Sequence, residues 1–211
     1  MEGLELQHLW QESPAGKRGY TLVAMHGRGG SMHDFEQLKD IWRLDDLNYL
    51  LLQGPDPFFG GWSWYDIPPN PLPGIRRSRK MLGTLLDSLH AKGYARERCF
   101  LFGFSQGCLL TFEFGARYPH ALAGYVGISG QLYDTHQLIH DMHPAATQKA
   151  DWLWSAGTLD GHFGIETTRI QAERLRAAGM RLDFVEWPKD HEIDHQEEVW
   201  FLRDWVAAHM K

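Results

Sequence analysis

Ser105 lies in a segment, GFSQG at residues 103–107, whose residue types and spacing could carry acyl-transfer chemistry. An apolar run at residues 99–102 precedes this segment, and a helical pattern over residues 108–117 follows it. A G-x-S-x-G segment between a strand and a helix is the signature of a tight turn that exposes the serine hydroxyl. The two glycines let the strand and the helix pass closely. The segment therefore predicts that Ser105 is a nucleophile.

A serine nucleophile needs a base, and the base needs an acid that orients it. Asp160 follows an apolar run at residues 152–155, and His191 follows another at residues 182–187. The order Ser, Asp, His, with both partners placed just after strands, is typical of hydrolases that carry this serine turn. We therefore expect Ser105 to attack an acyl carbonyl and His191 to accept and return the proton. Asp160 would orient the imidazole and stabilise its protonated form.

The negative oxygen that forms during acyl transfer needs two N–H donors. One donor is expected to be the backbone N–H of Gln106, the residue after the nucleophile, at the positive end of a helix. The second should come from the loop after an early strand, which here is HGRGG at residues 26–30, following the apolar run at residues 20–25. We expect the backbone N–H of Arg28 to be this second donor.

A long loop over residues 54–74 is rich in proline, glycine and aromatic residues. Loops of this length inside a compact domain are usually functional, so its aromatic side chains could line an acyl or alcohol site. Alternatively, they pack the loop against the core. Phe59 and Trp62 are expected nearer the substrate, and Trp64 and Tyr65 more in packing. The candidate substrate-binding residues are Gly27, Phe59, Trp62, Trp64 and Phe163. Arg28 could favour acidic substrates or pair with a nearby carboxylate.

Short apolar runs alternate with amphipathic, helix-like segments along the chain. Such alternation predicts an α/β fold with a mostly parallel sheet and helices on both faces. We expect one domain over residues 1–211, without a large cap domain. The strands are expected near residues 4–10, 20–25, 49–53, 99–102, 123–128, 152–155 and 182–187, and the helices near residues 32–42, 75–90, 108–117, 167–178 and 197–210.

The bulk composition is that of an ordinary globular protein. The 211 residues carry a formal net charge of −6, which gives no indication of a nucleic-acid partner. No apolar run reaches membrane-spanning length, and the first residues lack a secretory signal, so we expect a cytoplasmic protein. The two cysteines, Cys99 and Cys108, are expected to be buried thiols. Neither a cofactor nor a metal is expected, and the protein could be a monomer or a homodimer.

These pieces together resemble the phospholipase/carboxylesterase family of α/β-hydrolases, which includes the acyl-protein thioesterases. The resemblance runs from His26 to the last helix and rests on residues 26–30, 103–107 and 157–160, on WYDI at residues 64–67, and on His191. It implies a cofactor-free serine hydrolase of small or medium carboxylic esters or thioesters, with an α/β-hydrolase fold.

Three positions depart from the family pattern. Cys108 stands where a second glycine commonly follows the serine turn, and Asp190 stands where glycine commonly precedes the histidine. Asp190 is also the first replacement to test if Asp160 is not the acid. Residues 161–164, GHFG, replace an apolar, proline-containing stretch, so the third departure bears on the substrate.

Three other functions compete with the esterase prediction. Residues 191–195, HEIDH, match the zinc-protease motif H-E-x-x-H, but they follow a proline in a strand-to-helix loop, and a zinc protease would leave the serine turn unexplained. A catalytically silent binding protein could use the same scaffold. A cofactor-free perhydrolase could use the same Ser, His and Asp. The substrate is expected to be a small-molecule ester or thioester.

Overall fold

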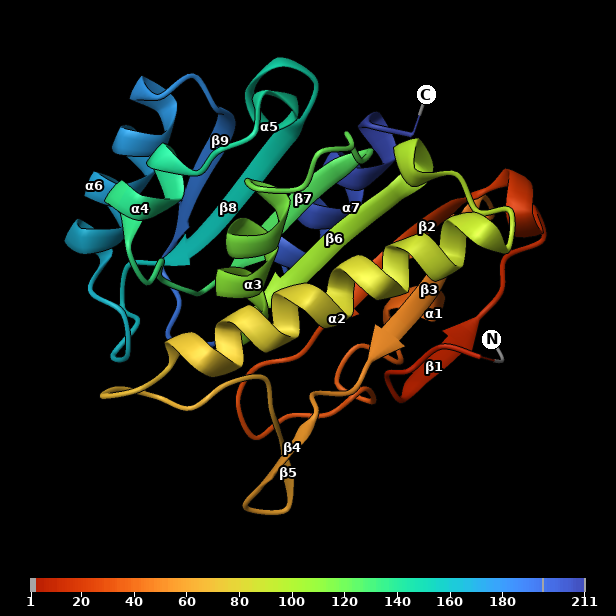
Figure 1. The fold of residues 1–211 in the computed structure, drawn as a ribbon, viewed down its shortest axis with the longest axis horizontal. Coiled ribbons are helices and arrows are strands. Elements are labelled where there is room, and N and C mark those ends of the chain that lie inside the picture. Colours follow the sequence, from red (N-terminus) through yellow and green to blue (C-terminus); the bar gives the residue numbers. More distant parts are fainter. Residues whose placement is uncertain (1–2, 195, 211) are drawn as a thin grey trace.

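The computed structural model describes residues 3–194 and 196–210, which form a central sheet of seven strands in the order β1-β3-β2-β6-β7-β8-β9 (Figure 1). β1 pairs antiparallel with β3, and the other neighbours are parallel. The predicted mostly parallel α/β sheet is confirmed. The strands are β1 (His8–Gln11), β2 (Tyr20–Met25), β3 (Leu47–Leu52), β6 (Cys99–Phe104), β7 (Gly124–Ile128), β8 (Asp151–Gly157) and β9 (Arg181–Trp187).

Helices cover both faces of this sheet (Figure 1). On one face, α1 (Leu38–Trp42) and α7 (Glu198–Ala208) share a core with the sheet through Trp42 and Trp205. The other face carries a larger core. Because both faces are covered, the central strands are apolar along their whole length rather than alternating. The helices on the larger core are α2 (Leu72–Ala91), α3 (Gln106–Gly115), α4 (Thr135–His140), α5 (Pro144–Gln148) and α6 (Ile165–Ala177).

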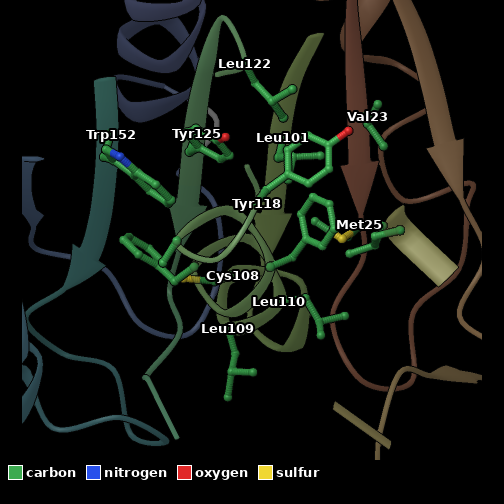
Figure 2. Close-up of a cluster of buried hydrophobic side chains, with 14 of the residues drawn as sticks. Val23, Met25, Leu101, Cys108, Leu109, Leu110, Tyr118, Leu122, Tyr125 and Trp152 are labelled. Carbon is green, nitrogen blue, oxygen red and sulfur yellow. The ribbon is translucent and has the colours of Figure 1, made fainter. Parts of the chain in front are cut away.

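α3 lies at the centre of the larger core, with side chains from β2, β6, β7 and β8 around it (Figure 2). It packs closely on the sheet at Gly115, where an added Cβ would lie 2.5 Å from Tyr125 and 2.7 Å from Trp152. The rings of Tyr125 and Trp152 are stacked, with their centroids 3.9 Å apart. Tight packing on this helix therefore fixes the position of its N-terminus, which follows Ser105.

Cys99 and Cys108 are both buried and unpaired, as predicted. Burial raises the pKa of both thiols. Among residues 3–194 and 196–210, each helix is too short or too polar to cross a bilayer.

The structure corrects two sequence predictions. The helix expected over residues 32–42 is only Leu38–Trp42, because residues 31–38 form successive turns and the side chain of Asp34 accepts the backbone N–H of Ser31. Such side-chain bonds compete with a regular helix. The loop expected over residues 54–74 contains a hairpin of β4 (Asp56–Phe58) and β5 (Gly61–Ser63). This loop ends at residue 71, earlier than expected, because α2 begins at Leu72 and a proline is tolerated in the first turn of a helix.

Candidate active site

Ser105 lies at the turn between β6 and α3, with φ 55° and ψ −110°. Glycine is required on both sides of it. A Cβ at Gly103 would lie 2.1 Å from the Gly107 carbonyl oxygen, and one at Gly107 would lie 2.2 Å from the Met25 carbonyl oxygen. A non-glycine residue with positive φ is strained, and such strain concentrates at functional sites. The local sequence therefore produces the predicted sharp turn.

His191 and Asp160 meet Ser105 at the carboxyl end of the sheet. The His191 Nε2 atom lies 2.9 Å from the Ser105 hydroxyl oxygen, and the Nδ1 atom lies 2.8 Å from Asp160 Oδ2. A carboxylate can only accept, so Nδ1 carries the proton and Nε2 is free to accept from the serine. The three predicted catalytic residues thus form a continuous hydrogen-bonded chain.

Asp160 is itself fixed by its own loop after β8. Its side chain is 3% exposed. Oδ1 accepts the backbone N–H groups of His162 and Phe163, at 2.8 and 3.0 Å. Because these bonds occupy Oδ1, the other oxygen is directed at His191.

Asp190 does not replace Asp160 as the partner of the imidazole. Its carboxylate accepts the backbone N–H groups of Gly161, at 3.1 Å, and His191, at 2.7 Å. These two donors lower the pKa of Asp190. The residue that departs from the family pattern therefore ties the Asp160 loop to the His191 loop.

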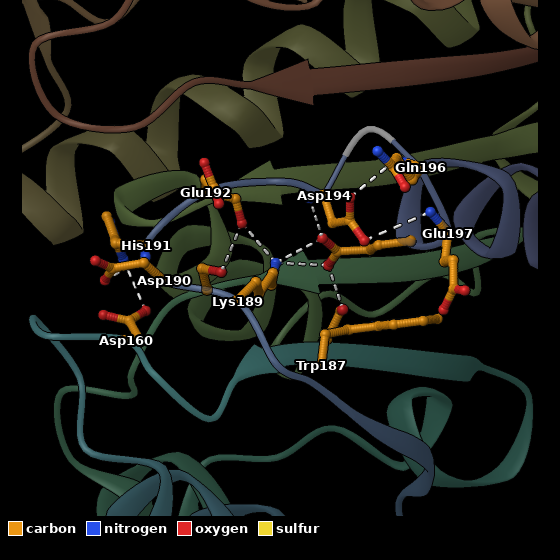
Figure 3. Close-up of polar contacts among 12 residues, drawn as sticks. Asp160, Trp187, Lys189, Asp190, His191, Glu192, Asp194, Gln196 and Glu197 are labelled. Carbon is orange, nitrogen blue, oxygen red and sulfur yellow. Dashed lines mark hydrogen bonds and ion pairs between the residues drawn. The ribbon is translucent and has the colours of Figure 1, made fainter.

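A buried ion pair anchors the start of the His191 loop to α7, and Figure 3 shows the dashed contacts of Lys189. Lys189 Nζ lies 2.7 Å from each carboxylate oxygen of Glu198, the first residue of α7, and both side chains are almost fully buried. Lys189 also donates to the Glu192 carbonyl at 2.6 Å. Glu198 accepts the Ser155 hydroxyl and the Asp194 backbone N–H. Burial lowers the pKa of Lys189, and the Glu198 carboxylate opposes this effect.

The segment at residues 27–30 is a turn closed by the Gly30 N–H on the Gly27 carbonyl, with Gly29 at φ 82°. Arg28 occupies the second position of this turn, whose N–H is not used by the turn itself. Gln106 is the first residue of α3, so its N–H has no acceptor within the helix. Both residues line one cavity with Ser105. The two residues predicted to supply the oxyanion donors therefore line the same cavity as the nucleophile.

Uncharged hydrogen bonds hold this turn in place. His26 Nε2 accepts the Gly54 N–H at 2.9 Å, so its Nδ1 donates to the Gly27 carbonyl at 2.6 Å. Burial lowers the pKa of His26, which favours this neutral form. The Gln106 side chain accepts the Trp64 N–H at 2.9 Å and donates to the Tyr65 carbonyl at 2.7 Å. The serine turn is thereby joined to the loop at residues 54–74.

A cavity of about 720 Å³ opens over Ser105. Apolar side chains form most of its wall, and they come from the loop at residues 54–74, from α2 and α3, and from Leu132, Tyr133 and Phe163. The residues that line it are Arg28, Phe58, Tyr65, Ile67, Pro68, Pro71, Ile75, Ser105, Gln106, Leu109, Gln131, Leu132, Tyr133, His162, Phe163 and His191.

Among the predicted substrate-binding residues, Phe163 lines this cavity, whereas Gly27, Phe59, Trp62 and Trp64 do not. Phe59 is 96% exposed at the tip of the hairpin, and Trp64 is fully buried. Phe59 therefore does not contact the cavity as expected, and Trp64 packs in the core, as the packing interpretation expected, rather than binding substrate.

Trp62 and Gly27 hold the loops together beside the cavity. The Trp62 backbone pairs with Gly30, and Gly27 packs so closely that an added Cβ would lie 2.9 Å from the Phe104 ring. The prediction missed Phe58, which lines the cavity in place of Phe59. The two-residue turn at the tip of the hairpin makes Phe58 and Phe59 differ in direction. Because the two residues are identical, the sequence gives no signal for which of them faces the cavity.

His195, the second histidine of the H-E-x-x-H match, lies outside the described residues. His191, the first, contacts Asp160 and Ser105. The motif therefore coincides with the histidine of the serine site.

The chain is similar in sequence to known hydrolases. A family model described as Phospholipase/Carboxylesterase matches residues 7–210. A probable carboxylesterase of Oryza sativa subsp. japonica is 29% identical over 157 residues, which are 71% of this chain and 59% of the rice protein. This chain thus spans less than two thirds of the length of that relative.

Two further matches cover nearly the whole chain. Acyl-protein thioesterase 1 of Yarrowia lipolytica is 24% identical over 211 residues, which are 90% of this chain and 92% of that protein. The crystal structure of esterase PE8 has a TM-score of 0.85 at 21% identity and covers 96% of this chain and 98% of its own. The last match shows the same fold.

Proposed function

Because the chain belongs to the phospholipase/carboxylesterase family of α/β-hydrolases, we propose that it is a serine carboxylesterase acting on small or medium acyl esters or thioesters. The observation that carries the proposal is the hydrogen-bonded chain from Ser105 through His191 to Asp160. The names of the relatives, carboxylesterase and acyl-protein thioesterase, support a hydrolase. A small-molecule substrate fits the cavity of about 720 Å³ over the serine.

In the first half of the proposed reaction, Ser105 Oγ attacks the acyl carbonyl while His191 Nε2 takes the hydroxyl proton. The carbonyl oxygen becomes negative and accepts the backbone N–H groups of Arg28 and Gln106. The tetrahedral intermediate then breaks its bond to the leaving oxygen or sulfur, which His191 protonates. The acyl group is left on Ser105.

Water completes the cycle. His191 takes a proton from the water as it attacks the acyl-enzyme carbonyl, and the same two N–H groups stabilise the second oxyanion. Collapse of this intermediate returns the proton to Ser105 and releases the carboxylic acid. Asp160 accepts from His191 Nδ1 throughout, which keeps Nε2 directed at the serine.

A p-nitrophenyl ester panel from acetate to palmitate, run on wild type and Ser105→Ala side by side, tests the proposal. We expect turnover by the wild type and a loss of several orders of magnitude in kcat for the variant, with unchanged folding. The preferred chain length would measure how much of the apolar wall the acyl group uses. Turnover that survives in Ser105→Ala would contradict the proposal, and a folded wild type without turnover would favour the binding-protein alternative. The single-domain organisation and cytoplasmic location stay predictions.

A further inference from the structure

The Arg28 guanidinium lies beside the cavity over Ser105 and stacks on an aromatic ring. Its Cζ atom lies 3.9 Å from the centroid of the Phe58 ring. None of the ion pairs within residues 3–194 and 196–210 includes Arg28. Stacking uses the flat face of a guanidinium and leaves the N–H groups at its edge free to bind a carboxylate in a bidentate manner. Phe58 therefore orients Arg28 without neutralising it.

The carboxylates of the adjoining segments have other partners. Asp56, in the strand that carries Phe58, is paired with Arg77. Asp34, just after the oxyanion turn, accepts the Ser31 backbone N–H at 3.1 Å. The alternative raised by the sequence, an arginine paired with a nearby carboxylate, is therefore not what the described residues contain.

The wall of the cavity differs in charge from the rest of the molecule. The chain has 27 acidic residues and a net charge of −6. No aspartate or glutamate is among the described residues that line the cavity, whereas Arg28 is. Arg28 is exposed and lines this cavity, so its charge is available to an anion that enters. An anion would therefore meet attraction in this cavity without a facing carboxylate to repel it.

We propose that the physiological substrate is an ester or thioester that carries a carboxylate a few bonds from the scissile carbonyl, and that Arg28 is the residue that recognises it. This inference rests on the proposed function. The backbone N–H of Arg28 would bind the oxyanion while its guanidinium binds the carboxylate. One residue would then fix the spacing between the two groups to about the length of an arginine side chain.

Pairs of substrates that differ only in charge test this inference. On the acyl side, monoethyl glutarate is compared with ethyl 4-carbamoylbutanoate, its carboxamide analogue. On the alcohol side, 4-acetoxybenzoate is compared with 4-acetoxybenzamide. The measurement is the ratio of kcat/KM for the anionic and neutral members of each pair, in wild type, Arg28→Gln, Arg28→Lys and Arg174→Gln. Arg174 is an exposed arginine of α6 that does not line the cavity.

The wild type should prefer the anionic member of at least one pair. Arg28→Gln should lower that ratio by about 10-fold to 100-fold, the range expected for hydrogen bonds to a charged group. Arg28→Lys should retain part of the preference, and Arg174→Gln should retain all of it. Glutarate should also inhibit wild-type hydrolysis of a neutral ester competitively, and more strongly than glutaramide.

Two kinds of failure are distinguishable. If Ser105 turns over neutral esters but shows no preference in either pair, only the role of Arg28 is overturned. The same holds if Arg28→Gln keeps the preference. Equal inhibition by glutarate and glutaramide would overturn it without any variant. If instead the wild type shows no Ser105-dependent turnover of any ester, the proposed function itself is wrong.

Discussion

On one side of Ser105, the oxyanion turn at residues 27–30 is held by uncharged groups, whereas on the other side the His191 loop is held by charges. The first side relies on His26, whose neutral ring joins Gly54 to Gly27, and on the Gln106 amide. The second relies on the buried Lys189–Glu198 pair. The oxyanion turn is thus fixed by neutral hydrogen bonds, whereas a buried ion pair fixes the loop of the histidine that becomes a cation during the reaction.

The largest effect should come from removing the charge that faces His191. An Asp160→Asn amide can donate to Nδ1 and thereby favour the tautomer in which Nε2 cannot accept the serine proton. We expect kcat to fall about 10⁴-fold, as for this change in other serine hydrolases, with little change in the thermal unfolding temperature. The measurement is kcat for p-nitrophenyl butyrate.

Asp190→Asn is the matched control for Asp160→Asn, because Asp190 contacts backbone N–H groups and not the ring. Its kcat should fall far less. Equal losses in the two variants, or an Asp160→Asn enzyme near wild type, would reassign the acid.

The second largest effect should appear in stability, on the charged side. Lys189→Met leaves Glu198 buried without its cation, which should lower the free energy of unfolding by about 3–5 kcal/mol. Adding Glu198→Gln removes the unpaired charge while keeping an acceptor for the Asp194 N–H, so the double variant should recover more than half of the loss. Urea denaturation gives both values. A single variant as stable as wild type would show that the pair does not hold the loop.

A smaller loss is expected on the uncharged side. Gln106→Ala keeps the backbone N–H but removes the side-chain contacts to Trp64 and Tyr65, at a cost of about 1–3 kcal/mol. Gln106→Glu should cost at least as much, because a carboxylate cannot donate to the Tyr65 carbonyl. Urea denaturation of the two variants gives the comparison. If Gln106→Ala cost as much as Lys189→Met, the contrast between the two sides would disappear.

The smallest effect should be a pH dependence of stability that arises from His26, on the uncharged side. Burial lowers the pKa of His26 in the folded protein, so below about pH 6.5 the unfolded chain binds its proton first. The folded state therefore loses stability as the pH falls from 6.5 toward the lowered pKa. His26→Asn should reduce this slope in urea denaturation series, and His136→Gln, at an exposed position, should not. An unchanged slope in His26→Asn would show that the folded protein does not hold His26 in its neutral form.

The parts of the site that could be predicted from sequence are those in which residue type and position along the chain suffice. Ser105 needs glycines on both sides, and Asp160 and His191 come directly after strands whose carboxyl ends meet at one edge of the sheet. Alternating apolar and amphipathic segments likewise indicated the α/β fold, because burial on both faces imposes continuous apolar strands.

The rest depends on contacts between distant segments. Whether Phe58 or Phe59 faces the cavity is decided by the turn of the hairpin, in which Phe59 takes φ 41°. Nothing in the sequence indicates that Glu198 is buried, because charged residues are rarely buried. Glu198 can be completely buried only because Lys189 pairs with it. The turns at residues 31–38 were missed because the Asp34 side chain competes with a helix that the apolar spacing favoured.

Ser105, activated by His191, is expected to form the acyl-enzyme. Incubation with a fluorophosphonate, which modifies activated serines, followed by intact mass and peptide mapping, tests this expectation. We predict one adduct per chain on Ser105 in the wild type, no adduct in Ser105→Ala, and much slower labelling in Asp160→Asn. An unlabelled wild type, or labelling that persists in Ser105→Ala, would show that Ser105 is not an activated nucleophile.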